Sequence, residues 1–245
     1  MGFENSWDNQ VRAESYSKLE FPNTYYLAYR DLPTIISKHV KGSKAVDFGC
    51  GAGRSTRFLK KLGFQVIGID ISQDMLNIAR GLDIQGDYQL VTNANYSHLG
   101  VESFDFVQSI FTFDNIPGWE NRTRILSSLR NLLKPTGRMI CLDSTPELYT
   151  NESASFTTKD FPENWTAKTG DIVRDIMNDV EDRRPVEDIF WTVSDYHKLF
   201  EMAELEVEAF YKPLGRLDEP YAWLMETQIA PWMIFVLKKK DVDNF

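Results

Sequence analysis

The chain has 245 residues, of which 42% are hydrophobic and 26% are charged, and its formal net charge is −9. A chain of this length can form one α/β domain with a large core and a modest insertion. The acidic balance disfavours nucleic acids as partners, because binding to a phosphate backbone needs a basic face. No apolar run approaches the ~20 residues that cross a bilayer, so we expect no membrane contact.

The cysteines and histidines give no indication of a metal site. Neither Cys50 nor Cys141 is placed for a disulfide, and the histidines at positions 39, 98 and 197 lack metal-ligand spacing. The first residues have neither the basic start nor the apolar segment of a secretory signal. We therefore expect a cytoplasmic protein with no bound metal.

Residues 1–43 precede the first expected strand and are rich in aromatic side chains. Within them, Leu32 to Val40 have the spacing of a helix that leads to Lys41 and Gly42. Such a segment cannot join a parallel sheet and must lie across it. We therefore separate residues 1–43, as an amino-terminal segment, from a main domain at residues 44–245.

The stretch from Lys44 to Arg80 predicts a strand, a glycine turn, a helix and a second strand. The first strand ends in Asp47, glycines follow at positions 49, 51 and 53, and the second strand is closed by Asp70. Glycine suits this turn because the backbone must bend tightly and approach a ligand. An acid about 20 residues beyond the glycines is placed to accept both hydroxyls of a ribose.

The glycine spacing separates two kinds of nucleotide ligand. Dinucleotide binders use G-x-G-x-x-G, whose third glycine would fall where this chain has Arg54. The D-x-G-x-G-x-G pattern from Asp47 to Gly53 instead resembles the class I S-adenosylmethionine (SAM) dependent methyltransferases. A second matching pattern, L-K-P-x-G-x followed by an apolar residue, begins at Leu133. The resemblance implies SAM as the methyl donor, and an NAD-dependent oxidoreductase is one alternative.

The rest of the chain predicts strands at residues 88–91, 104–109, 138–142, 205–211 and 232–237, and helices that begin at Ser72, Asn121 and Ser194. The resemblance implies a Rossmann-like, doubly wound sheet of seven strands, mostly parallel with an antiparallel last strand. An N-terminal helical lid and an insertion after the fifth strand, at about residues 146–191, complete the expected α/β fold. Residues 172–180 of the insertion predict one amphipathic helix.

The resemblance also implies roles for single residues at the SAM site. Asp70 is expected on the ribose, and Ile71 and Met75 on the two faces of the adenine. Asn93 can accept a hydrogen bond from the adenine amine, and Arg30 is a candidate partner for the methionine carboxylate. The expected SAM-binding residues are Tyr16, Tyr25, Arg30, Gly49, Cys50, Gly51, Gly53, Asp70, Ile71, Met75, Asn93, Ala94, Ser109 and Ile110.

Methyl transfer from a sulfonium requires the acceptor atom in line with the methyl group at about 3 Å, and it needs no nucleophilic side chain or metal. No catalytic residue is assigned for this reason. Asp114, His98, His197 and Tyr149 are available as general bases if the acceptor must lose a proton. The insertion can line an acceptor pocket through Tyr149, Phe156, Phe161 and Trp165. We expect methylation of a small molecule at nitrogen or oxygen, with a SAM-binding protein that lacks transferase activity as the second alternative.

Overall fold

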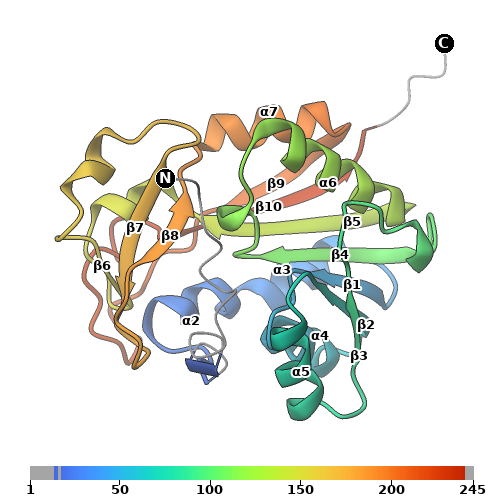
Figure 1. Cartoon of the computed structure of the whole chain (residues 1–245), viewed down its shortest axis with the longest axis horizontal. Helices are drawn as coiled ribbons and strands as arrows, with labels where there is room; N and C mark the ends of the chain where they lie inside the picture. Colours follow the sequence, from blue (N-terminus) through green and yellow to red (C-terminus); the bar gives the residue numbers. More distant parts are fainter. Residues whose placement is uncertain (1–13, 16–17, 241–245) are drawn as a thin grey trace.

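A computed structural model of the chain describes residues 14–15 and 18–240, and its main element is a seven-stranded sheet. The strands are β1 (Lys44–Phe48), β2 (Gln65–Asp70), β3 (Asp87–Leu90), β4 (Phe104–Ile110), β5 (Leu133–Ser144), β9 (Leu205–Tyr211) and β10 (Trp232–Lys239). Their order across the sheet is β3-β2-β1-β4-β5-β10-β9 (Figure 1). The predicted seven-stranded sheet is confirmed.

The strand order reverses direction between β1 and β4, and this reversal creates the site. β1 pairs in parallel with β2 on one side and with β4 on the other, so that Asp47 lies between Gly68 and Gln108. β10 is antiparallel to both β5 and β9, as expected for the last strand. In open α/β sheets a ligand binds outside the carboxyl ends of the strands at such a reversal.

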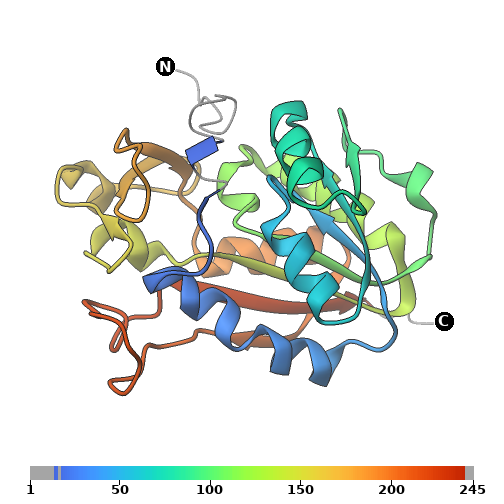
Figure 2. The same ribbon diagram turned by 90° about the horizontal axis from the view of Figure 1, so that it is seen from below.

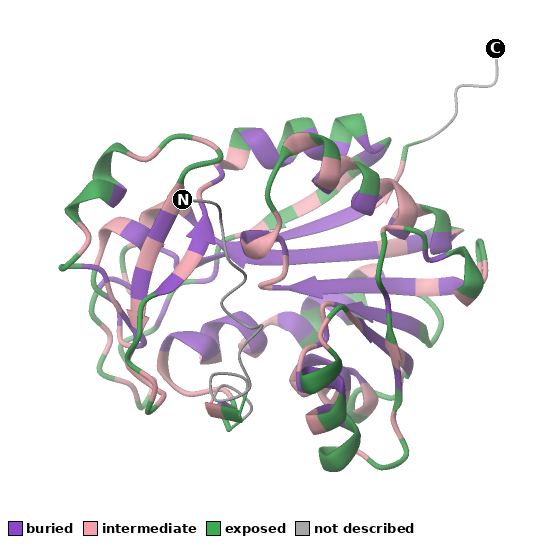
Figure 3. Cartoon of the chain, in the orientation of Figure 1, coloured by how far each residue is buried: buried purple, intermediate pink, exposed green. Residues whose placement is uncertain are grey.

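Helices cover both faces of the sheet (Figures 1 and 2). One face carries α2 (Asn23–Arg30), α3 (Leu32–His39), α4 (Arg54–Lys61) and α5 (Gln73–Leu82), and the other carries α6 (Trp119–Leu132) and α7 (Val193–Met202). The short 3-10 helices are η1 (Ser97–Leu99), η2 (Phe113–Asn115), η3 (Pro146–Thr150) and η4 (Pro162–Thr166). Two apolar clusters fill the spaces between sheet and helices, and Figure 3 shows the strands as the most buried part of the molecule. No helix in the described ranges is long and apolar enough to cross a membrane.

A second, three-stranded antiparallel sheet lies between β5 and α7 in the chain. Its strands are β6 (Phe156–Thr157), β7 (Ile172–Met177) and β8 (Val186–Ile189), in the order β6-β7-β8. The predicted helix at residues 172–180 is wrong, because burial along β7 alternates with the period of two that a strand requires. Val173, Asp175 and Met177 face inward, whereas the intervening residues are half-buried. Pairs of apolar residues at both ends of the segment imitate helical spacing.

Several boundaries also differ from the predictions; α6, for example, begins at Trp119 and not at Asn121. The N-cap of α7 is Thr192 and not Ser194, the predicted cap, because Thr192 forms a capping box with Asp195. Their side chains each accept a hydrogen bond from the other's backbone N–H, at 3.2 and 3.0 Å. β5 begins at Leu133 rather than at residue 138, since Leu133 already pairs with Phe104 of β4.

Candidate active site

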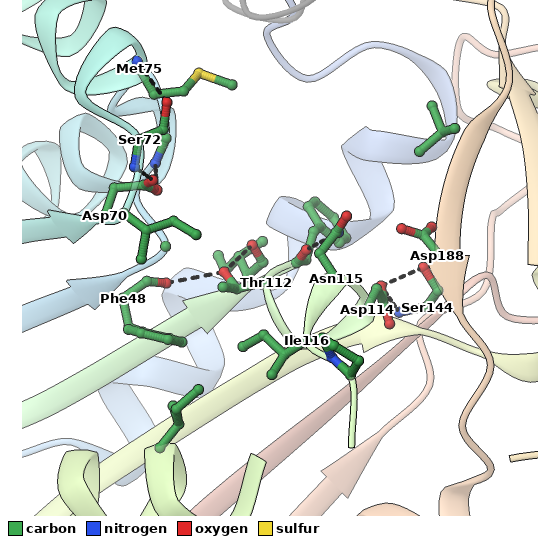
Figure 4. A pocket seen from close by; sticks show the side chains of 18 of the residues that line it. Phe48, Asp70, Ser72, Met75, Thr112, Asp114, Asn115, Ile116, Ser144 and Asp188 are labelled. Carbon is green, nitrogen blue, oxygen red and sulfur yellow. Dashed lines mark hydrogen bonds between the residues drawn. The ribbon is translucent and has the colours of Figure 1, made fainter. Parts of the chain in front are cut away.

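One cavity of about 500 Å³ opens at the carboxyl ends of β1, β2 and β4. This volume is in the range of small-molecule sites. Figure 4 shows its length: Asp70, Ser72 and Met75 lie at one end, and Asp114, Ser144 and Asp188 at the other. We call the first the nucleoside end and the second the insertion end.

The glycine loop forms the floor of the nucleoside end. Gly49, Gly51 and Gly53 have φ values of 69°, 51° and 81°, in the left-handed region that favours glycine. A Cβ on Gly49 would lie 2.2 Å from Oγ1 of Thr112, so this glycine is needed for packing. A Cβ on Gly51 would have only the sulfur of Met75 within 4 Å, at 4.0 Å, and Gly51 lines the cavity. The loop therefore leaves space for a ligand above Gly51.

Asp70 closes β2 and holds the two loops of the nucleoside end together. Its Oδ2 accepts a hydrogen bond from the Gly51 N–H and its Oδ1 accepts one from the Ser72 N–H, each at 2.8 Å. The Ser72 side chain in turn caps α5 by accepting from the Met75 N–H at 3.3 Å. Each carboxylate oxygen can accept more than one hydrogen bond, so Asp70 keeps acceptor capacity for a ligand.

Asp47, the first residue of the glycine pattern, has a structural role. Its Oδ2 accepts hydrogen bonds from Ser55 Oγ at 2.7 Å and Thr56 Oγ1 at 2.6 Å, and its Oδ1 accepts one from Gln108 Nε2 at 3.2 Å. Burial raises the pKa of Asp47 to about 6, although the hydrogen bonds from Thr56, Ser55 and Gln108 lower it. The carboxyl thus joins β1 to the start of α4 and to β4, and it does not line the cavity.

Ile71, Met75, Asn93 and Ala94 form the outer wall of the nucleoside end. Ile71 is 63% exposed, which is unusual for a large apolar side chain that follows a buried strand, and Met75 is buried. The Oδ1 of Asn93 accepts a hydrogen bond from the Asn95 N–H at 3.0 Å. An amide oxygen has two lone pairs, so one remains for a ligand amine.

Several predicted SAM-binding residues do not line the cavity. Arg30 points elsewhere: its Nη1 donates to Glu219 Oε1 at 2.7 Å, and its Nη2 donates to Asp31 at 2.8 Å. The structure thus gives Arg30 contacts different from the one predicted, because its ion pair with Glu219 attaches α2 to the loop before β10. Cys50 and Ser109 are buried behind the loop and strand, and the nearest atom to a Cβ on Gly53 would be the Tyr88 hydroxyl, at 2.6 Å. Tyr16 lies outside the described residues.

The remaining predicted residues line the cavity: Tyr25, Gly49, Gly51, Asp70, Ile71, Met75, Asn93, Ala94 and Ile110. They combine an acid for a ribose, an apolar wall for a purine and a glycine floor, so the nucleoside end fits SAM. On these grounds the loop, Asp70 and the Ile71–Met75 wall are the residues that would hold the donor.

An aromatic cluster leads from the middle of the cavity to the insertion end. Tyr25, Phe111, Phe156 and Trp232 contribute rings whose centroids are 4.7–5.8 Å apart in the contacting pairs. The guanidinium of Arg54 lies 5.1 Å from the centre of the Tyr25 ring, within cation–π distance. Phe111 has φ +58°, which is a strained conformation for an aromatic residue and turns the chain at the end of β4.

Three aspartates line the insertion end, from η2, β7 and β8: Asp114, Asp175 and Asp188. Asp114 Oδ2 accepts from the Ser144 N–H at 3.0 Å and from Ser144 Oγ at 2.8 Å. Asp188 Oδ2 accepts from the Tyr149 hydroxyl at 3.1 Å. Burial raises the pKa of all three carboxyls, and the neighbouring Asp114 raises it further for Asp175, to about 7.

Among the predicted bases and acceptor residues, only Asp114 and Phe156 line the cavity. Tyr149 is buried behind Asp188, and His197 packs on the rings of Phe210 and Phe235. His98 lies in η1, Phe161 is half-buried, and Trp165 is 70% exposed. No group of three or more His, Cys, Asp or Glu in the described residues has the arrangement of a metal site.

Sequence reasoning missed Asp175, Asp188 and Trp232. The first two lie in the matching stretches V-R-D and V-E-D, in which an aspartate follows a valine by two residues. Because that spacing places both side chains on one face of a strand, reading β7 and β8 as strands would have brought the aspartates together. The sequence around Trp232 does not distinguish it from a core residue, since many buried strands begin with an apolar side chain.

The comparisons with known proteins agree with this geometry. A family model described as a methyltransferase domain matches residues 46–141. The N-demethylindolmycin N-methyltransferase of Streptomyces griseus is 25% identical over 224 residues, which cover 84% of this chain and 91% of that protein. The ubiquinone biosynthesis O-methyltransferase of Nitrosococcus oceani is 31% identical over 116 residues, and the match spans about half of its length (47%) and 44% of this chain.

Solved structures share the whole architecture. The CcbJ methyltransferase from Streptomyces caelestis superposes with a TM-score of 0.67 at 15% identity, covering 97% of this chain and 99% of that one. The PH0226 protein from Pyrococcus horikoshii has a TM-score of 0.66 at 18% identity and covers 95% of this chain and 99% of its own. These likenesses show the fold.

A doubly wound sheet with a glycine floor and a strand-end acid defines a nucleoside-binding Rossmann-like protein. With the matched methyltransferase domain and these relatives, the chain is a SAM-dependent methyltransferase, and its fold is that of class I.

Proposed function

We propose that the cavity binds SAM at the nucleoside end and a small-molecule methyl acceptor at the insertion end. The observation that carries this proposal is that Asp70 and Asp188 line the two ends of one and the same cavity (Figure 4). In this arrangement Asp70 binds the ribose, Ile71 and Met75 enclose the adenine, and Asn93 accepts from the adenine amine.

Bound SAM supplies an electrophilic methyl group on a sulfonium. The protein positions the reactants, since holding the acceptor in line with the methyl group lowers the activation free energy by several kcal/mol. The aromatic cluster of Tyr25, Phe111, Phe156 and Trp232 excludes water and orients the acceptor. We assign residues 18–43 to the wall of the site, as part of the amino-terminal lid segment, because Tyr25 of α2 is one of these rings.

The class of acceptor follows from charge and from the relatives. The relatives named above are an N-methyltransferase and an O-methyltransferase, which supports transfer to nitrogen or oxygen. The net charge of −9 disfavours a nucleic acid as acceptor. Both cysteines are buried and free, which accords with the proposed cytoplasmic location.

Calorimetric titration with SAM, and separately with S-adenosylhomocysteine, tests the nucleoside end. We expect both to bind wild-type protein, and we expect Asp70→Ala to weaken binding by about 10- to 100-fold, equivalent to about 1–3 kcal/mol of charge-assisted hydrogen bonds. Asp87→Ala is the matched control, because Asp87 is an exposed acid on the neighbouring strand β3 and should leave the affinity unchanged.

Other results would point to the alternatives. Binding of NADH instead of SAM would indicate an NAD-dependent oxidoreductase. Binding of SAM without methylation of any compound in a metabolite extract would favour a SAM-binding protein without transferase activity. Equal SAM affinity in Asp70→Ala and wild type would remove the central assignment.

A further inference from the structure

The insertion end of the cavity has more buried carboxyl groups than its own structure can neutralise. Asp114, Asp175 and Asp188 come from three different elements and face the same space. Asp175 and Asp188 are diagonal neighbours on one face of the β7–β8 pair, since Asp175 pairs with Val186 and Asp188 pairs with Val173. Aspartate is disfavoured in strands, so two of them on an inward face require an explanation.

Asp175 is the least satisfied of the three. Its side chain is 2% exposed, and its Oδ1 has no hydrogen-bond partner among the described residues. Asp114 and Asp188, in contrast, each accept hydrogen bonds from a serine or tyrosine hydroxyl. A buried carboxyl without a partner is costly, so such an oxygen at a cavity wall marks the place of a ligand donor.

The nearby positive charge is already committed to the protein. Arg122 is buried beside this group, and it donates from Nε to the Ile116 carbonyl at 2.5 Å and from Nη2 to the Phe113 carbonyl. Its guanidinium also lies 4.0 Å from the centre of the Trp191 ring, and Arg122 does not line the cavity. Arg122 lowers the pKa of Asp114, of the buried Asp143 and of Asp188, and this single guanidinium cannot neutralise those three carboxyls and Asp175 together.

The surroundings of the carboxyls favour an organic cation over a metal ion as their ligand. The described carboxyls do not converge as metal ligands do. The same part of the cavity has aromatic and aliphatic walls, from Phe156, Trp232, Leu148 and Met177. A ligand that satisfies both surfaces has an apolar body with a charged hydrogen-bond donor at one end.

We propose that the methyl acceptor is a small primary or secondary amine whose ammonium group is bound by Asp175 and Asp188, with Asp114 beside them, and whose apolar body packs against the aromatic cluster. The inference rests on the proposed function, because it identifies the acceptor of that same site. It assigns the transfer to nitrogen.

The reaction balances with these groups. An ammonium gives one proton to a carboxylate of this group, and the freed nitrogen lone pair forms a bond to the methyl carbon. The carbon–sulfur bond breaks and leaves its electron pair on sulfur. The products are the N-methylated acceptor as an ammonium ion, neutral S-adenosylhomocysteine and one protonated carboxyl. Burial raises the pKa of Asp175 to about 7. A base with this pKa removes a proton more readily from an ammonium, whose pKa is about 10, than from an alcohol, whose pKa is near that of water at about 16.

Three probes of one shape test the inference: phenethylamine, 2-phenylethanol and phenylacetate. Each is titrated into protein saturated with S-adenosylhomocysteine, and methylated product is measured by mass spectrometry after incubation with SAM. We expect phenethylamine to bind at least about tenfold more tightly than the alcohol, and phenylacetate to bind worst. In Asp175→Asn and Asp188→Asn the preference for the amine over the alcohol should fall by about tenfold.

The controls separate this inference from the proposed function. S-adenosylhomocysteine should bind both variants as it binds wild type, because neither aspartate touches the nucleoside end. Glu187→Gln is the matched variant on β8: Glu187 points outward, where its Oε1 accepts from Arg174 Nη2 at 2.7 Å, and its loss should leave the amine preference intact. Absence of S-adenosylhomocysteine binding would contradict the proposed function itself. Normal binding of it, with no preference for the amine or an unchanged preference in Asp175→Asn, would overturn the amine assignment alone.

Discussion

The two ends of the cavity both depend on aspartates, but they use them in opposite ways. Asp70 at the nucleoside end has backbone N–H donors on both oxygens at 2.8 Å, whereas Asp175 at the insertion end is buried with an unpartnered oxygen. The first carboxylate stabilises its own loops before any ligand binds. The second destabilises its surroundings until a cation arrives. The donor site is therefore built by the fold, and the acceptor site is completed by its ligand.

Gly49→Ala should have the largest effect on stability, because it disrupts the packing of the glycine loop at the nucleoside end. The new Cβ would lie 2.2 Å from Thr112 Oγ1, and alanine would be held at φ +69°. We expect the free energy of unfolding to fall by about 2–4 kcal/mol, as overpacking and left-handed strain combine. Urea unfolding followed by circular dichroism measures this.

Gly51→Ala is the comparison for that variant. Its Cβ meets only the Met75 sulfur at 4.0 Å, so it should lose about 1 kcal/mol from the φ of 51° and should chiefly weaken SAM binding. Equal destabilisation by the two substitutions would contradict the distinction between a packing glycine and a ligand-facing one.

Asp175→Asn should stabilise the protein at neutral and alkaline pH. Burial, with the neighbouring Asp114, raises the pKa of Asp175 to about 7, so the folded chain holds a proton that the unfolded chain releases above pH about 4. Stability must then fall as pH rises from about 4 to about 8, and asparagine abolishes this contribution. We expect a gain on the order of 2 kcal/mol at pH 8 and almost none at pH 4.

Chemical unfolding at several pH values measures the difference. The titratable groups that act on Asp175 are Asp114 on η2, Tyr149 on η3 and Asp188 on β8. Glu187→Gln, on the outer face of the same hairpin, provides the reference curve. A variant that is less stable than wild type at pH 8 would show that Asp175 is already neutralised inside the protein.

Arg30→Ala should have the smallest effect and should leave SAM binding unchanged. Its ion pair with Glu219 is mostly buried, with side chains 12% and 9% exposed, and it fastens α2 to residues 214–219. We expect a loss of about 1 kcal/mol in the free energy of unfolding, since residues 216–218 beside the pair are exposed and water can solvate the Glu219 carboxylate once Arg30 is removed. Thermal unfolding and SAM titration together test this, and a marked loss of SAM affinity would restore Arg30 to the donor site.

Most of the residues that line the nucleoside end could be picked out from the sequence, because they are close in the chain. The glycine loop, Asp70 and Met75 all lie within 27 residues of Gly49, and their spacing is dictated by a strand, a turn and a helix. The insertion end gathers η2, β7, β8 and β10 across more than a hundred residues, and no local period links them. Apolar pairs at both ends of residues 172–177 concealed the strand, and with it both aspartates of the hairpin. Arg30 shows the converse error. Its charge suited a carboxylate ligand, but its distant partner Glu219 could be recognised only in the tertiary structure.

β10 is inserted between β5 and β9, although it follows both of them in the chain. During synthesis, the parallel strands β1 to β5 can therefore assemble early, while the edge of β5 stays unpaired until β10, which follows β9 in the chain, has been made. Over that interval a long apolar edge is open to pairing with other chains, which makes slow or interrupted translation an aggregation hazard. Trp232 begins β10 and is part of the aromatic cluster. The strand that completes the sheet therefore also completes the wall of the proposed acceptor site, so pairing of β10 with β5 couples the two.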